Sequence, residues 1–123
     1  MTLTLSTAGR NAAADAVTAL MDGGTLELRS GTGTVVAAFA LPSPAFAAAA
    51  DGVATGNGVP MSTTANAGTI ASARILNSVG VPEITGLTVT LTGGGGDIEL
   101  TNLSPGAGST VEIASLSYTQ PAA

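Results

Sequence analysis

The sequence predicts a mainly β protein, an antiparallel β-sandwich of about seven short strands with one N-terminal α-helix. From Gly24 onward, apolar and polar residues alternate in short runs, and clusters of Gly, Pro, Asn, Asp and Ser separate the runs. Before Gly24 the apolar residues instead have the spacing of a helix. Because helices and strands do not alternate along the chain, a parallel α/β sheet is not expected.

The 123 residues are expected to form a single domain, since this length is typical of one domain. Within 1–123, an extended N-terminal arm covers 1–5, a helix covers 6–22, and the β-sandwich covers 25–119. The chain has two Phe, one Tyr and no Trp. Its core therefore has to be built mainly from Ala, Val, Leu and Ile.

The helix has sequence signals for both of its ends and for its buried face. Ser6 or Thr7 is placed to cap the first turn by accepting a backbone N–H bond. Gly23 and Gly24 supply a left-handed stop. The i, i+3, i+4, i+7, i+8 spacing predicts that the helix packs against a sheet through Ala13, Ala16, Val17, Leu20 and Met21.

A β-hairpin is expected directly after the helix. Leu26 and Leu28 share one face of a strand over 25–30, and a Ser-Gly-Thr-Gly turn leads into a second strand over 34–41. The Pro-Ser-Pro segment that follows ends the second strand, because proline has no backbone N–H to donate to a sheet.

The remaining strands are predicted from shorter patterns. A short strand interrupted by glycines is expected within 53–59, and a loop is expected over 60–67 because its residues are small and polar. Further strands are expected over 68–76, 87–92, 97–102 and 110–119.

The last strand changes its alternation part-way along. Val111 and Ile113 fall on one face, whereas Leu116 falls on the other. Such a change of phase predicts a β-bulge, here near Ala114 and Ser115.

The charge composition argues against two classes of partner. Charged residues make up 9% of the chain, the net charge is −5, and the three basic residues are arginines. Nucleic acids and anionic membrane surfaces bind clusters of positive charge, so neither is an expected partner. No apolar run approaches the length that a transmembrane helix needs.

We also expect no enzyme activity, and we assign no catalytic, cofactor-binding or metal-binding residue. The chain has no His and no Cys, which removes the commonest general base and the thiol nucleophiles and ligands. The Ser and Thr hydroxyls also lack a Lys that replaces His as the activating base. The abundant Thr is better explained by the preference of exposed strand faces for this residue.

Two features resemble functional motifs but have simpler explanations. Gly93–Gly96 precedes a strand rather than a helix, and no Lys is present, so a flexible hairpin connection is favoured over a phosphate-binding loop. Asp97, Glu99 and Glu112 offer carboxylates to a cation or to a glycosidase-type reaction. Hard cations need six or more oxygen ligands, and the chain lacks the aromatic residues of a sugar site, so solvated outer-face acids are favoured.

Arg29 and Arg74 both fall in predicted strands. Two interpretations stay open for them: a cross-strand ion pair, for example with the acids around Glu27, and a contact with another subunit.

The high apolar content of the chain also has two explanations. Either Ala and Gly account for it, or part of the surface is covered by other subunits.

Five segments occur in a characteristic order along nearly the full chain. They are the capped Ala-rich helix over 6–21, the Gly-Gly-Thr-Leu-x-Leu-x-Ser-Gly segment over 23–31, an apolar strand running to Pro-Ala-Phe over 35–46, Ala-Arg-Ile-Leu-Asn-Ser over 73–78, and the pair Asp-Ile-x-Leu-x-Asn and Thr-Val-x-Ile-x-Ser-Leu within 97–116. This pattern resembles a family of small structural proteins encoded by tailed bacteriophages and prophages. The sequence departs from that family where Ser72 and Ala73 replace aromatic residues.

The resemblance implies a virion protein that is assembled in the cytoplasm of the bacterial host. Its partners would be the major capsid protein or other virion structural subunits, and we expect a homo-oligomer. We favour a capsid decoration (cement) protein that binds the outer capsid lattice. A tail or head–tail connector ring component is the alternative, and a carbohydrate-binding attachment module is a second alternative, which the lack of Trp disfavours.

The arm over 1–5 alternates Thr and Leu, which predicts that it adds a strand to the sheet edge of a neighbouring subunit. Deleting residues 1–5 is therefore expected to reduce the amount of this chain in purified virions, as measured by quantitative mass spectrometry. Unchanged incorporation would rule out this role for the arm.

Overall fold

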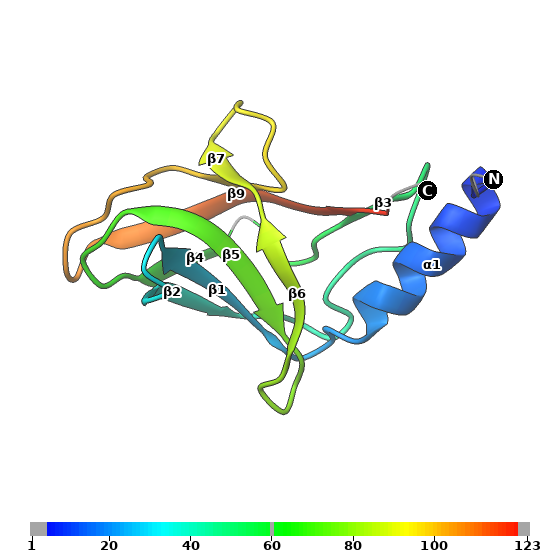
Figure 1. Cartoon of the computed structure of the whole chain (residues 1–123), viewed down its shortest axis with the longest axis horizontal. Helices are drawn as coiled ribbons and strands as arrows, with labels where there is room; N and C mark the ends of the chain where they lie inside the picture. The colour runs from blue at the N-terminus through cyan, green and yellow to red at the C-terminus, as the bar shows by residue number, and fades with distance from the viewer. Residues whose placement is uncertain (1–4, 60, 121–123) are drawn as a thin grey trace.

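The computed structural model describes residues 5–59 and 61–120, which form one helix and nine strands in two sheets (Figure 1). Residues 1–4 of the predicted arm lie outside this range. The elements are α1 (Thr7–Ala19), β1 (Thr25–Ser30), β2 (Val35–Ala40), β3 (Val53–Thr55), β4 (Met61–Thr64), β5 (Ile70–Leu76), β6 (Pro82–Leu87), β7 (Val89–Leu91), β8 (Ile98–Leu100) and β9 (Thr110–Thr119). The prediction of a mainly β sandwich with an N-terminal helix is confirmed, with nine strands in place of about seven.

The first sheet has the strand order β2-β1-β5-β6, and the second has the order β3-β9-β8-β7. β4 is an additional partner of β9. Among the described residues, every strand pair is antiparallel except β7 with β8. In Figure 1, α1 lies at one end of the sandwich, close to β3 and to the end of β9.

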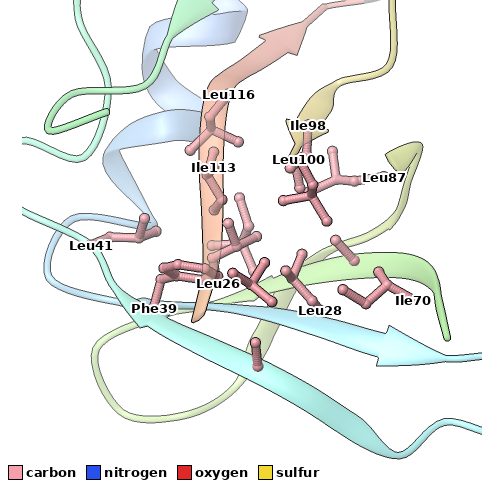
Figure 2. Close-up of a cluster of buried hydrophobic side chains, with 14 of the residues drawn as sticks. Leu26, Leu28, Phe39, Leu41, Ile70, Leu87, Ile98, Leu100, Ile113 and Leu116 are labelled. Atoms are coloured by element: carbon pink, nitrogen blue, oxygen red, sulfur yellow. The ribbon is translucent and has the colours of Figure 1, made fainter. Parts of the chain in front are cut away.

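Side chains from the inner faces of both sheets meet in one core (Figure 2). Leu26 and Leu28 of β1 have no exposed surface, as the alternation of the first hairpin strand predicts. Ile98 and Leu100 of β8, in the other sheet, are equally buried. The largest side chains exposed by less than 2% are Met21, Leu26, Leu28, Val36, Ile75, Ile98, Leu100, Val111, Ile113 and Leu116.

The bulge predicted in the last strand is confirmed. Glu99 of β8 lies opposite Ser115 of β9. The next residue of β8, Leu100, lies opposite Ile113, so Ala114 is the extra residue on β9. The bulge returns the later side chains of β9 to the core face, and both halves of this strand therefore contribute to the core.

The prediction of a loop over 60–67 is wrong for residues 61–64. Met61–Thr64 form β4, which pairs antiparallel with the first half of β9, while Pro60 lies outside the described residues. The residues of β4 are half-buried or exposed, so the strand has no apolar alternation to detect. Backbone hydrogen bonding to β9 fixes this segment, and side-chain patterns carry no information about it.

The strand predicted over 87–92 is divided between the two sheets. β6 ends at Leu87 in the first sheet and β7 begins at Val89 in the second, so the chain crosses between the layers at Thr88. β7 then pairs with β8 in parallel, which differs from the all-antiparallel prediction, and Gly93–Gly96 is not a hairpin connection. The sequence alternation of Leu87, Val89 and Leu91 runs through the crossing without a break, yet burial decreases along it, since Leu87 is buried, Val89 is half-buried and Leu91 is exposed.

The predicted ends of the helix are close to those observed. The Ser6 hydroxyl oxygen accepts a hydrogen bond from the Gly9 N–H at 3.1 Å, so Ser6 is the N-cap. The helix ends at Ala19, three residues before the predicted end, and Gly23 then adopts a left-handed φ of +69°.

The predicted buried face of the helix is right in part. Met21 is fully buried and Val17 packs against the core, as predicted, whereas Ala16 and Leu20 are exposed and the structure buries Ala14 and Thr18 instead. The helix is rotated by about one residue, roughly 100°, from the predicted orientation. Its orientation is set by polar side chains that bind loop backbone, and these outweigh a shallow stripe made mostly of Ala.

Leu100→Ala in β8 is expected to lower the free energy of unfolding by about 2–5 kcal/mol, because it leaves a cavity among fully buried side chains. The matched control is Leu91→Ala in the neighbouring strand β7, where the side chain is 53% exposed. This control is expected to change stability by less than about 0.5 kcal/mol. Urea denaturation measures both, and equal effects would contradict the described packing.

Candidate interaction surface

The three acidic residues considered as a cation site serve separate purposes. Asp97 fixes the crossing point between the sheets, since its Oδ2 accepts hydrogen bonds from N and Oγ1 of Thr88 at 3.1 and 3.0 Å. The Thr88 hydroxyl oxygen accepts the Asp97 N–H in return, at 3.0 Å. Glu112 is exposed on β9. Among residues 5–59 and 61–120, no group of three or more carboxylates lies close enough together to hold a metal ion.

Glu99 pins the four-glycine loop between β7 and β8. Its two carboxylate oxygens accept the backbone N–H groups of Gly93 and Gly95 at 3.2 and 3.0 Å. Both glycines have a positive φ, +90° and +82°, which other residues adopt only with strain. The hydrogen bonds from Gly93 and then Gly95 lower the pKa of Glu99. The loop is thus tied to β8, in contrast to the flexible connection expected from its composition.

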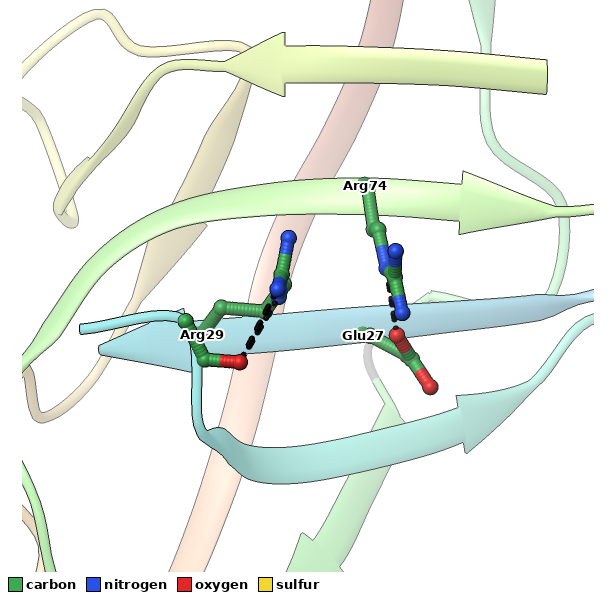
Figure 3. Close-up of polar contacts among 4 residues, drawn as sticks. Glu27, Arg29 and Arg74 are labelled. Atoms are coloured by element: carbon green, nitrogen blue, oxygen red, sulfur yellow. Dashed lines mark hydrogen bonds and ion pairs between the residues drawn. The ribbon is translucent and has the colours of Figure 1, made fainter. Parts of the chain in front are cut away.

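The two strand arginines bind different partners (Figure 3). Arg74 Nε donates to Glu27 Oε1 at 2.6 Å, forming an ion pair between directly opposite residues of β5 and β1. Arg29 donates from Nε and Nη2 to the Gly33 carbonyl oxygen at 3.2 and 2.9 Å, and so closes the β1–β2 turn. The cross-strand pair considered for these arginines is therefore formed by Arg74.

The side of α1 that faces the protein carries the polar anchors. Four side chains of the helix and the turn after it bind backbone groups of distant segments at 2.7–3.2 Å. The pairs are Arg10 with the Gln120 carbonyl, Asn11 with the Gly52 N–H, Asp15 with the Ala49 N–H, and Asp22 with the Ala45 N–H. Because helix N-terminal residues thereby bind the end of β9, both ends of the described chain lie at the same end of the sandwich (Figure 1).

The opposite side of α1 is apolar and exposed. We name it the α1 outer face, and it consists of Ala8, Ala12, Ala16, Ala19 and Leu20. These positions follow the i, i+4, i+8, i+11, i+12 spacing of one helix face. None of the five is charged, and Leu20 is 53% exposed. The helix thus buries Ala14, Val17 and Met21 at least in part and leaves a second group of apolar residues exposed.

The three aromatic side chains do not form a platform for a sugar. Phe39 and Phe46 are core residues, 3% and 5% exposed. The Tyr118 hydroxyl donates to Gln120 Oε1 at 2.8 Å, beside the anchor of α1, and burial raises the pKa of this Tyr. All three rings therefore serve packing and local hydrogen bonding.

Comparison of the chain with protein-family models, curated proteins and solved structures gives no match. In the part of the chain that the structure describes, no helix is long and apolar enough to cross a bilayer.

Apolar spacing alone does not reveal the α1 outer face, because the same spacing also predicts a buried side. Asn11, Asp15, Thr18 and Asp22 follow the i, i+4, i+7, i+11 spacing of a second, polar stripe. A polar stripe of side chains that accept backbone N–H bonds is a signal for docking onto loops. The polar stripe and the Ala-rich stripe are each compatible with burial, and the hydrogen bonds to the loops turn the polar stripe inward.

Glu99→Gln is expected to reduce the hydrogen-exchange protection of the Gly93 and Gly95 amides at neutral pH, measured by NMR. The folded-state pKa of Glu99 lies below its ordinary value of 4.5, so the ionised carboxylate stabilises the loop above that pH. As the pH falls through the lowered pKa of Glu99, the wild type loses this stabilisation of the loop. The variant has no carboxylate at this position, so the protection of its loop is not expected to change over the same pH range. Glu112→Gln, at an exposed acid on β9, is the matched control, and equal protection in all three proteins would contradict this role of Glu99.

Proposed function

We propose that the chain is a non-enzymatic structural protein of a bacteriophage virion, and specifically a capsid decoration (cement) protein on the outer capsid lattice. The observation that carries the proposal is the α1 outer face, which is apolar, uncharged and exposed. Contiguous exposed apolar residues mark surfaces that bind other proteins. The segments that resemble tailed-phage virion proteins support the same function.

The proposed mechanism is burial of this surface at junctions between capsid subunits. Each Å² of apolar surface removed from water contributes about 25 cal/mol, and the contribution is repeated at every site of a lattice. The α1 outer face contains no charge that would lose hydration on binding. With a net charge of −5, the chain favours a neutral or basic facing surface on the partner.

The alternative within the same class is a tail or head–tail connector ring component, which would use the α1 outer face between copies in a closed ring. A carbohydrate-binding module is disfavoured, because Phe39 and Phe46 are in the core and Tyr118 is hydrogen-bonded within the chain.

In purified particles, we expect about one copy of this chain for each copy of the major capsid protein, or one copy for every few capsid subunits. Quantitative mass spectrometry of particles measures this ratio. A small number of copies per particle would contradict lattice-wide decoration and favour the tail or connector alternative. Absence of the chain from particles would contradict the virion function altogether.

The same measurement on a variant tests the surface itself. Ala16→Glu places a charge in the middle of the α1 outer face at an exposed position, and it is expected to reduce incorporation. Ala107→Glu is the matched control: it makes the same substitution at an exposed residue of the β8–β9 turn, at the opposite end of the sandwich (Figure 1). Equal incorporation of both variants would exclude the α1 outer face as the contact surface.

A further inference from the structure

At three places in the chain a glycine follows an Asp or Asn residue: Asp22-Gly23, Asp51-Gly52 and Asn57-Gly58. Such pairs have a specific reactivity, because the amide nitrogen of the glycine can attack the side-chain carbonyl carbon of the residue before it. Glycine has no Cβ to hinder this approach. Asn57 is the one asparagine of the sequence that precedes a glycine.

The three glycine amides differ in their hydrogen bonds. The Gly23 N–H donates to the Pro42 carbonyl at 3.2 Å, and the N–H of the buried Gly52 donates to Asn11 Oδ1 at 2.7 Å. Within residues 5–59 and 61–120, the Gly58 N–H has no hydrogen bond, and Gly58 is exposed. Attack by Gly23 or Gly52 would break an existing hydrogen bond, whereas attack by Gly58 would not.

The other asparagines are protected in other ways. Asn11 lies inside α1, where the next amide belongs to the hydrogen-bonded backbone of the helix. The Asn77 side chain is bound through both of its polar atoms. Asn66 and Asn102 precede an alanine and a leucine, whose side chains hinder the approach of the backbone nitrogen.

The side-chain nitrogen of Asn57 has a structural role. Asn57 is half-buried, and its Nδ2 donates to the Pro44 carbonyl at 3.1 Å. Its backbone N–H donates to the Ala45 carbonyl at 2.8 Å. These two bonds join Asn57 to the segment that leads to Phe46, which is in the core and 5% exposed.

We propose that Asn57 is a site of spontaneous deamidation and that its modification loosens the segment 44–46. The Gly58 nitrogen loses its proton to solvent and bonds to Asn57 Cγ. The bond from Cγ to Nδ2 breaks, and the side-chain nitrogen takes up a proton and leaves as ammonia. Water then opens the cyclic imide and yields aspartate or isoaspartate, with no oxidation or reduction. This inference is independent of the virion function, because the reaction needs only this chain and water.

The loosening follows from the loss of a donor. Both products have a carboxylate in place of the amide, so they cannot donate to the Pro44 carbonyl, and their oxygens repel it. Isoaspartate also adds a methylene to the main chain beside the bond to Ala45. Ala45 donates its own N–H to Asp22, in the turn after α1, so the change extends to the attachment of the helix.

The reaction is tested by incubating the whole folded chain at mildly alkaline pH and mapping its peptides by mass spectrometry. Deamidation is expected at Asn57 before any other asparagine. The product at this position is expected to be lost in Asn57→Gln, where a larger ring would have to close, and retained in the control Asn102→Gln. Earlier deamidation at another asparagine, or none at Asn57, would overturn the proposal.

The importance of the free glycine amide is tested by Asp51→Asn, which creates a second Asn-Gly pair in the same molecule. Because the Gly52 N–H is bound by Asn11, position 51 is expected to deamidate more slowly than Asn57 in the folded chain. In urea, where this bond is lost, the two rates are expected to be similar. Equal rates in the folded chain would contradict the role assigned to the Gly58 amide.

The structural consequence is tested with Asn57→Asp, which reproduces one product. The amides of Ala45 and of position 57 are expected to lose hydrogen-exchange protection, measured by NMR. Asn102→Asp, with the same change in charge at an exposed asparagine, is the matched control and is expected to leave both amides protected. Unchanged protection in Asn57→Asp would overturn the proposed loosening.

Discussion

Backbone hydrogen bonding along β9 joins the second sheet together. This ten-residue strand pairs with β4 over its first residues, with β3 over its last ones and with β8 between them. Because one strand serves three partners, the side chains of its two halves have to reach the same core, and the bulge at Ala114 makes this possible. Arg10 binds the carbonyl of Gln120, the residue directly after β9, so the position of the helix depends on this strand as well.

Carboxylates that accept hydrogen bonds from backbone N–H groups occur at several places in the structure. Asp97 holds the crossing between the sheets, Glu99 holds the glycine loop, and Asp15 and Asp22 hold the β2–β3 loop against the helix. A chain with few charges thus uses several of its eight acidic residues as internal acceptors. These bonds fix irregular backbone segments, whose polar groups have no partners in a regular sheet.

Hydrogen bonds from loop backbone to polar side chains of α1 also account for the surface on which the proposed function rests. The polar residues of α1 are used toward the protein, and the Ala-rich side is consequently left toward solvent. An interface made of small side chains lets a partner approach the helix backbone closely and contains no charge to desolvate.

The sequence by itself determined the class of fold, the hairpin formed by β1 and β2, a helix cap at Ser6 or Thr7 and the bulge in β9, because each depends on local patterns. It did not determine that Thr88 is a crossing point, that 61–64 pair with β9, or that Gly93–Gly96 join parallel strands, since pairing partners are chosen by distant backbone segments. The candidate surface also required the tertiary structure. Two stripes on α1 were each compatible with burial, and the hydrogen bonds of Asn11, Asp15 and Asp22 to loops far away in sequence decided which one faces solvent.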